Sequence, residues 1–326
     1  MGGRNASDYY SASPNASRSV LILVGPTASG KTPTSLLIAK KLDAEIISAD
    51  SRQVYKYMDI GTAKPMLSER QTVQHYFLDE IAPDESFNAG AFGKKGREII
   101  DDILRRGKSP LVVGGSGLYV QALVDGFFEG PSADPEIRER LHRRLHDEGA
   151  DKLLAELRRL DPASAAKMLP SNTRRIVRAL EVSLVTGRPI SELQQSRVEI
   201  NFKSVFAGLR WDRQELYRRI DRRVDCMMEQ GLVEEIKKLL QRGYSKELNS
   251  LRTTGYMEVF DFLEGTISYD RMVELIKQNS RRFAKRQLTW FRHDPRIRWF
   301  DVQEEEDFPD VAVKICEYFC SRGGRI

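Results

Sequence analysis

Cysteine and histidine are scarce in this chain of 326 residues, which has three cysteines (Cys226, Cys316 and Cys320) and four histidines. Three cysteines cannot build a disulfide framework, and the scattered histidines form no zinc-ligand pattern. A reducing, cytoplasmic location is the simplest interpretation. Apolar runs are also short. None approaches the roughly 18 residues that a transmembrane helix needs, so we expect no membrane partner.

The N-terminal segment lacks the apolar core of a signal peptide. Residues 1–18 are polar, small and rich in serine, which is typical of an unstructured segment. We therefore expect a disordered tail over 1–18.

Acidic residues are almost missing between Lys277 and Arg298, where eight basic residues accompany Asp294 alone. Residues 301–310 then carry six acids and no base, and the whole chain has a net charge of only +5. Positive charge concentrated in one window favours a polyanionic partner. A solvated surface helix is the alternative interpretation.

The most specific motif is GPTASGKT at residues 25–32, which matches the phosphate-binding pattern G-x-x-x-x-G-K-[ST] in full. An apolar run at 20–24 predicts the strand before it, and residues 34–42 predict the helix after it. Loop amides at a helix start bind phosphate oxygens. We therefore predict a diphosphate or nucleotide site formed by Gly25, Pro26, Thr27, Ala28, Ser29, Gly30, Lys31 and Thr32.

Pro33 follows this motif and supplies no N–H. A first helical turn tolerates proline. Since one amide is missing from the anion nest, Pro33 favours a diphosphate over a triphosphate as the ligand.

Strands and helices alternate through the first half of the chain. Residues 45–48, 76–81 and 111–113 read as strands, and 90–106 reads as a helix. Short connections between such elements are typical of a mostly parallel sheet with flanking helices. We predict an α/β fold like that of P-loop NTPases, with the ligand beyond the carboxyl ends of the strands.

A different pattern begins near residue 130. Residues 134–147, 150–159, 161–168 and 172–186 predict four short helices without a strand, so we expect a helical insertion domain over 130–200. A strand at 204–209 then returns to the sheet. Helices at 212–241, 255–264 and 269–291 follow, with a strand at 298–300 and a last helix. The core domain is therefore predicted to combine 19–129 with 201–326.

Asp50, at the end of the second predicted strand, is the only acid well placed beside the loop. A kinase would need a carboxylate for Mg²⁺ at the end of an apolar strand, and the strand at 111–113 ends instead in two glycines. Asp50 is suited to hold Mg²⁺ or to accept a proton from a nucleophile. The structural alternative is an N-cap.

Several motifs together with the loop resemble the tRNA dimethylallyltransferases. They are SADSRQVY at 48–55, DIGTAKP at 59–65, GGSGLY at 114–119, RRIVRALE at 174–181, GY at 255–256 and AKRQLTWFR at 284–292. The similarity spans roughly 20–300 in the order of that family. Ser116 departs from it, because threonine is usual there.

The resemblance implies transfer of a dimethylallyl group from dimethylallyl diphosphate to N6 of adenosine 37 in the tRNA anticodon stem-loop. It implies catalytic roles for Asp50, Lys31, Thr32, Ser116 and Arg223, with Thr32 holding Mg²⁺. Separately, we expect a monomer. The resemblance further implies that the insertion domain contacts tRNA. The implied tRNA-binding residues are Asp50, Ser51, Arg52, Gln53, Ser116, Arg174, Arg175, Ile176, Val177, Arg178, Lys285, Arg286 and Gln287.

Three other functions remain open. An adenylate isopentenyltransferase acting on free AMP, ADP or ATP would need neither the insertion nor the basic window. A small-molecule kinase would need the second acid. A non-catalytic RNA-binding protein or nucleotide switch would keep its activity when Asp50 is replaced by alanine.

Overall fold

The computed structural model describes residues 18–126, 134–194 and 199–325, so the predicted tail lies outside the described residues except for Arg18. The chain divides into two compact units. The first comprises the described residues of Met1–Asn88, Lys95–Val120 and Asn201–Ile326, and the second those of Ala89–Lys94 and Gln121–Ile200. The predicted insertion at 130–200 falls within the second unit.

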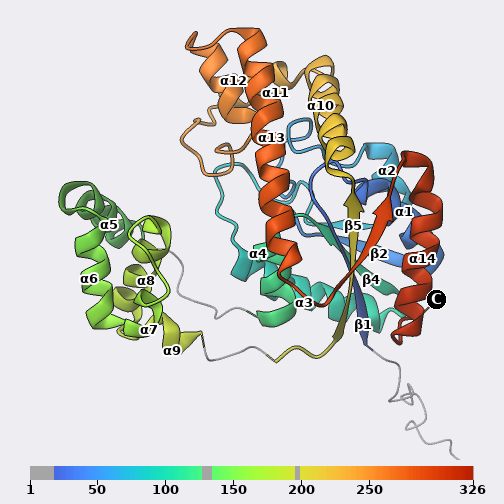
Figure 1. Ribbon diagram of the computed structural model, residues 1–326, viewed down its shortest axis with the longest axis horizontal. Helices are drawn as coiled ribbons and strands as arrows, with labels where there is room; N and C mark the ends of the chain where they lie inside the picture. Colours follow the sequence, from blue (N-terminus) through green and yellow to red (C-terminus); the bar gives the residue numbers. More distant parts are fainter. Residues whose placement is uncertain (1–17, 127–133, 195–198, 326) are drawn as a thin grey trace, which may run out of the picture. The chain divides into compact units, whose positions relative to one another are not determined.

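A parallel sheet forms the centre of the first unit (Figure 1). Its strands are β1 (Ser19–Val24), β2 (Ala44–Ser48), β3 (His75–Tyr76), β4 (Ser109–Gly114), β5 (Lys203–Trp211) and β6 (Ile297–Val302). Their order is β3-β2-β4-β1-β5-β6, and every pairing is parallel. The predicted α/β fold with a mostly parallel sheet is confirmed.

The helices of this unit cover the sheet and extend beyond it. They are α1 (Lys31–Leu42), α2 (Leu67–Thr72), α3 (Ala89–Arg105), α4 (Gly117–Gln121), α10 (Arg213–Glu229), α11 (Leu232–Gln241), α12 (Tyr256–Leu263), α13 (Tyr269–Arg292) and α14 (Phe308–Ser321). The first residues of α3 and the last of α4 belong to the second unit. A π-helical turn (Ala122–Gly126) and a 3-10 turn (Glu305–Asp307) complete the assignments.

Helices α1 and α14 lie side by side on one face of the sheet (Figure 1). Leu21 and Leu23 of β1 pack there against Ile38 of α1 and Ile315 and Phe319 of α14. All six residues of β1 are buried, as expected for a central strand covered on both faces. Burial on both faces of the sheet therefore explains why successive residues before the phosphate loop are apolar.

The second unit is helical and has its own core. It contains α5 (Pro135–Glu148), α6 (Ala150–Leu160), α7 (Pro162–Ala165), α8 (Thr173–Thr186) and α9 (Ile190–Leu193). Leu141, Leu153, Leu157 and Leu180 pack together in that core. The four helices predicted from the sequence are present, and α9 was not predicted.

Two predicted elements are shorter than expected. The third strand was predicted over 76–81, but β3 ends at Tyr76 because Phe77 and Asp79 have positive φ angles of 63° and 55°, which extended strands exclude. The helix predicted over 212–241 is two helices, α10 and α11. Gly231 separates them with a φ of 93°, a conformation that glycine adopts without a Cβ clash.

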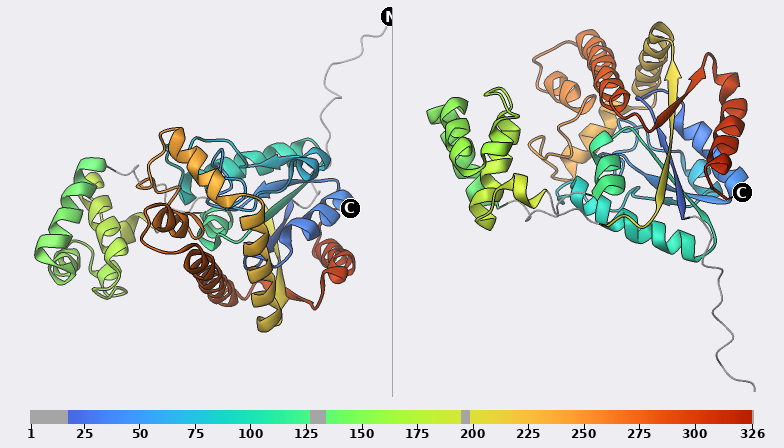
Figure 2. Two further views of the ribbon diagram at one scale, coloured as in Figure 1. Left: turned by 90° about the horizontal axis from the view of Figure 1, so that it is seen from above. Right: turned by 60° about the horizontal axis from the view of Figure 1, so that its bottom comes forward.

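The strand order brings distant segments to one edge of the sheet. The phosphate loop follows β1, Asp50 follows β2 and Ser116 follows β4, while β5 leads into α10. Figure 2 shows α10 and α13 running alongside each other. Because all strands are parallel, these segments share the carboxyl edge, where ligands bind in such sheets.

Candidate active site

The phosphate loop turns tightly into α1, which begins at Lys31, earlier than the predicted residue 34. Gly30 has a φ of 84°, and a Cβ there would lie 2.2 Å from the ring of Phe308, so both backbone and packing require glycine. Pro33 is the third residue of α1. The first four amides of a helix have no intrahelical acceptor, so proline costs the helix no hydrogen bond there.

Side chains from the C-terminal half of the chain hold this loop in place. The Trp211 indole N–H donates to the Ser29 carbonyl (2.9 Å), and Arg219 Nε donates to the Ala28 carbonyl (2.9 Å). Gln287 accepts from the Thr27 amide (2.8 Å) and donates to the Gly115 carbonyl (3.0 Å). The loop is therefore preorganised by three residues that lie far away in the sequence.

The Lys31 ammonium is a donor within the loop. Its Nζ lies 3.0 Å from the Gly25 carbonyl oxygen and 2.7 Å from that of Pro26. An ammonium group has three protons, so one remains for an anion. Burial and the positive charge of Arg223 lower the pKa of Lys31 to about 7, while Asp50 acts in the opposite direction.

Arg223, on α10, shares this environment. Burial lowers its pKa, the Asp50 charge raises it and Arg219 lowers it. Lys31, Arg223 and Asp50 are thus close enough to interact electrostatically. The structure thus brings two cations and one carboxylate, which lie far apart in the sequence at positions 31, 223 and 50, into one site.

Asp50 also caps the turn that follows it. Its Oδ1 accepts from the amides of Arg52 (2.8 Å) and Gln53 (3.4 Å). Residues 51–54 form a turn and no helix. Capping uses one carboxylate oxygen, so Oδ2 remains available for a ligand.

Ser116 lies beside this turn. Its Oγ accepts from the Ser51 amide (3.1 Å), and its own amide donates to the Ala49 carbonyl (3.2 Å). An accepting hydroxyl still has its proton to donate. The side chain therefore joins β4 to the segment after β2 and offers a donor next to Asp50.

Thr32 is the residue best suited to a metal ion. Its hydroxyl makes no hydrogen bond within the described part of the chain, and its carbonyl accepts from the Ser35 hydroxyl (2.8 Å). Mg²⁺ is commonly held by one or two protein oxygens together with phosphate oxygens. Among the described residues no group of three His, Cys, Asp or Glu forms an all-protein metal site, so a metal at Thr32 would depend on a phosphate ligand.

The lowered pKa of Lys31 predicts that diphosphate affinity depends on pH. Lys31 is protonated below its pKa of about 7 and loses its charge above it. A bound diphosphate raises that pKa, so binding takes up a proton and affinity should fall by up to about tenfold per pH unit above 7. Calorimetric titration with inorganic pyrophosphate from pH 6 to 9 measures this dependence.

The Lys31→Ala variant is the control for this titration, since it retains only the ligand's own ionisation. Subtracting its profile isolates the contribution of Lys31. Equal slopes for the two proteins would contradict the prediction.

The candidate RNA contacts of the first unit differ in their surroundings. Gln53 Nε2 donates to the carbonyls of Thr62 and Ala63, both at 3.1 Å, so that amide is engaged within its own loop. Gln287 is buried against the phosphate loop. Lys285 and Arg286 are exposed on α13.

The basic window divides into paired and unpaired cations. Lys277, Arg281 and Arg296 form ion pairs with Asp225, Asp221 and Asp294. Within the described ranges the other five, Arg282, Lys285, Arg286, Arg292 and Arg298, have no ion pair. Lys285 and Arg292 also line a cavity of about 390 Å³ beside Pro26. These unpaired charges are the ones available to a polyanion.

The aromatic residues of this region also differ in their exposure to solvent. Phe291 is 2% exposed and belongs to the interior, whereas Trp290 is 44% exposed. A Cβ on Gly117 would lie 2.2 Å from the Trp290 ring, which places the indole against the start of α4.

In the helical unit, the predicted RNA contacts lie on α8. Arg174 and Arg175 are exposed, while Ile176 and Val177 pack in the helical core. Arg178 forms an ion pair with the buried Glu181 (2.9 Å). Of these five predicted contacts, Arg174 and Arg175 are therefore the exposed ones.

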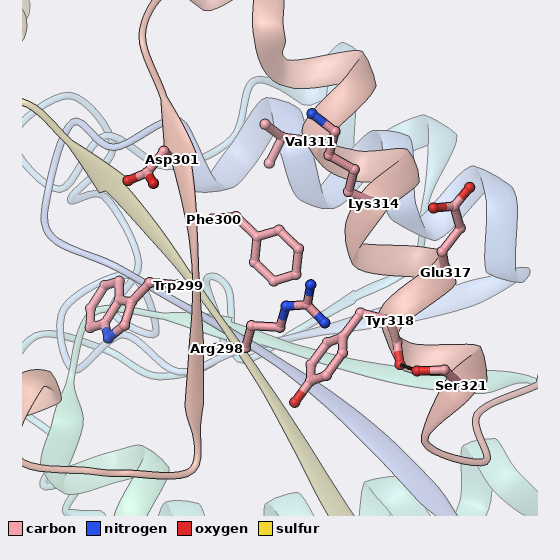
Figure 3. A pocket seen from close by; sticks show the side chains of 9 residues that line it. All are labelled: Arg298, Trp299, Phe300, Asp301, Val311, Lys314, Glu317, Tyr318 and Ser321. Carbon is pink, nitrogen blue, oxygen red and sulfur yellow. Dashed lines mark hydrogen bonds between the residues drawn. The ribbon is translucent and has the colours of Figure 1, made fainter.

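A further hollow of about 520 Å³ lies between β6 and α14 (Figure 3). The Arg298 guanidinium lies 4.8 Å from the ring centroid of Tyr318 and 5.4 Å from that of Phe300. No residue of the phosphate loop lines it, and neither do Asp50 and Ser116. It is not part of the candidate active site.

Comparison with known proteins identifies the family to which this chain belongs. A family model described as IPP transferase matches residues 53–294. The chain belongs to the IPP transferase family. A tRNA dimethylallyltransferase of Pelotomaculum thermopropionicum is 43% identical over 314 residues, covering 96% of this chain and 99% of the relative. That of Thermotoga maritima is 48% identical over 296 residues, covering 91% and 96%.

Solved structures of IPP transferase relatives share the fold. A tRNA isopentenylpyrophosphate transferase from Bacillus halodurans aligns with a TM-score of 0.69 and 39% identity, covering 94% of this chain and 98% of that one. A eukaryotic dimethylallyltransferase acting on tRNA aligns with a TM-score of 0.80 and 29% identity, covering 94% and 80%. The resemblance predicted from the sequence motifs is confirmed. In the described part of this family member, no helix is long and apolar enough to span a membrane.

Proposed function

We propose that this chain transfers a dimethylallyl group from dimethylallyl diphosphate to N6 of adenosine 37 in tRNA, releasing diphosphate. The observation that carries the proposal is the grouping of Lys31, Arg223 and Asp50 at the phosphate loop of an IPP transferase family member. A small-molecule kinase would need a second acid beside the loop, whereas β4 ends in Gly114.

The first step breaks the allylic C–O bond, and its electron pair leaves with the diphosphate. Negative charge grows on the leaving oxygens, so preorganised donors stabilise the transition state more than the ground state. The loop amides, the Lys31 ammonium and the Arg223 guanidinium are the proposed donors.

Bond formation follows between N6 of adenosine and the allylic carbon. The amine then carries an extra proton, and Asp50 Oδ2 accepts it. The Ser116 hydroxyl, which accepts from the Ser51 amide at 3.1 Å, donates to the adenine and orients it. Each atom is accounted for: the prenyl group moves to nitrogen, one proton moves to carboxylate and diphosphate leaves.

Mg²⁺ fits this arrangement at the Thr32 hydroxyl. Bound there, it would neutralise diphosphate charge as a Lewis acid. Thr32 would hold the ion together with the phosphate oxygens.

The RNA side of the proposal rests on charge and exposure. A stacked base cannot reach a partly buried carboxylate at the edge of the sheet, so adenosine 37 has to leave the stack. Arg52, Lys285 and Arg286 of the first unit and Arg174 and Arg175 of the helical unit are the proposed contacts to the anticodon stem-loop, mainly through phosphates. We propose that the enzyme acts as a monomer in the cytoplasm, consistent with its three unpaired cysteines.

A product assay tests the proposal. The protein is incubated with Mg²⁺, dimethylallyl diphosphate and an unmodified anticodon stem-loop, and the digested RNA is examined by mass spectrometry for N6-dimethylallyl adenosine. Free AMP and ATP are run in parallel. Product on AMP alone would favour the adenylate isopentenyltransferase, and ATP hydrolysis without product would favour the kinase.

A further inference from the structure

Glu235, on α11, holds a segment that leads away from the active site. Its Oε2 accepts from the amides of Asp59 (2.8 Å) and Ile60 (2.7 Å), and its Oε1 accepts from the amide of Gly61 (3.1 Å). Three successive amides directed at one carboxylate form an anion nest. Here the nest is filled by a side chain of the protein itself.

Tyr256, at the start of α12, completes this contact. Its hydroxyl donates to Glu235 Oε1 (2.6 Å), and the side chain is fully buried. A Cβ on Gly61 would lie 2.3 Å from the Tyr256 ring, so the backbone at 61 approaches the ring as closely as glycine allows. The buried Tyr256 of α12 thus holds the Glu235 carboxylate in place.

The segment 51–64 carries this constraint back to Asp50. Gln53 donates to the carbonyls of Thr62 and Ala63 and accepts from the Ser48 hydroxyl (3.0 Å). Gln53 and Arg52 also donate their amides to Asp50. A shift of residues 59–61 therefore moves the turn that Asp50 caps.

Lys64 ties the other end of the segment. Its buried ammonium donates to the Tyr55 carbonyl (2.6 Å) and pairs with Asp59 (2.9 Å) and with Asp79. The pair with Asp59 holds the segment within itself and the pair with Asp79 ties it to the loop after β3, whereas Glu235 is the one of these groups that ties it to α11. Within the described residues, the hydrogen bonds of the Glu235 carboxylate go to Asp59, Ile60, Gly61 and Tyr256, and none reaches the phosphate loop.

We propose that Glu235 is a positioning residue for the RNA substrate, which holds the segment 51–64 so that Asp50 and Arg52 meet the adenosine. This rests on the proposed function. Because Glu235 acts through the segment and not through the phosphate loop, its loss affects use of RNA and leaves use of dimethylallyl diphosphate unchanged.

The test compares Glu235→Gln with Glu234→Gln. Glutamine has the same shape but one accepting oxygen, so it cannot serve all four donors. We expect KM for the anticodon stem-loop to rise about tenfold and KM for dimethylallyl diphosphate to stay within about twofold. Glu234 is the matched control, since it is exposed on the same helix and interacts with Lys237 (3.7 Å).

Tyr256→Phe provides the second variant, because it removes one donor and leaves the three amides bound to Glu235. It should give a smaller rise in the same KM. Hydrogen exchange at the amides of residues 59–61 reports the contact independently of activity. Faster exchange in Glu235→Gln with both KM values unchanged would show a purely structural role and overturn the proposal, as would equal behaviour of the two glutamine variants.

These readouts separate the two proposals. If the wild-type protein modifies no RNA, the proposed function fails whatever the variants do. If it modifies RNA and Glu235→Gln raises both KM values equally, only the positioning role fails.

Discussion

Replacing Asp50 with asparagine should lower kcat for RNA prenylation by about 10²- to 10⁴-fold, the usual contribution of a general base. Asparagine keeps an oxygen that accepts from the Arg52 amide, now at 2.8 Å from Asp50, so the turn persists. It removes the group that takes the N6 proton. Single-turnover measurement with saturating RNA and dimethylallyl diphosphate gives the rate of this step.

Asp84→Asn is the matched control, because Asp84 is an exposed acid of the same unit. Its rate should equal that of the wild type. Asp50→Ala additionally removes the cap and should weaken RNA binding as well. Full activity in Asp50→Asn, with the melting temperature unchanged, would assign the carboxylate a capping role only.

Replacing Arg223 with glutamine should lower kcat by about 10²- to 10³-fold, the range found when one charge-stabilising donor is lost. The guanidinium is partly buried and interacts electrostatically with Asp50 and Lys31, so its charge acts on the leaving diphosphate in a site with reduced screening. Removing it also removes the positive charge that lowers the pKa of Lys31. The fall in diphosphate affinity should therefore move to higher pH than in the wild type.

Arg222→Gln serves as its control, since Arg222 is exposed on the same helix. The two variants change net charge equally, so a general electrostatic effect would appear in both. Equal kcat values for them would rule out a specific role of Arg223. Pyrophosphate titrations from pH 6 to 9 on both proteins measure the displacement of the pH profile.

Local patterns predicted the parts of the fold that depend on neighbouring residues. The run at 20–24 with the loop at 25–32 gives β1, the phosphate loop and α1, because a buried strand, a glycine turn and a helix start are each coded within a few residues. Asp50 was found in the same way, as a carboxylate at a strand end.

Local sequence patterns could not predict contacts between residues that lie far apart in the chain. Trp211 and Arg219 hold carbonyls of the phosphate loop across more than 180 positions of sequence, and neither belongs to a local motif. Glu235 was missed for the same reason. Gln287 was assigned to RNA, but its buried amide joins the Thr27 amide to the Gly115 carbonyl.

The two corrected elements, β3 and the helix predicted over 212–241, differ in whether the sequence contained a signal for their true ends. Gly231 lies within a long helical pattern, and a glycine there is a recognised signal for a helix end. Phe77 gave no such signal, because a positive φ is unusual for an aromatic residue. Phe77 is 1% exposed, so its ring is buried while its backbone has this conformation.

The strand order has a consequence for biosynthesis. β1 lies between β4 and β5, so it leaves the ribosome before both of these neighbours, which begin at Ser109 and Lys203. Trp211, Arg219 and Gln287, which brace its loop, emerge later still. Such high contact order makes folding slow. A nascent chain therefore acquires a competent anion nest only after Gln287 has been synthesised.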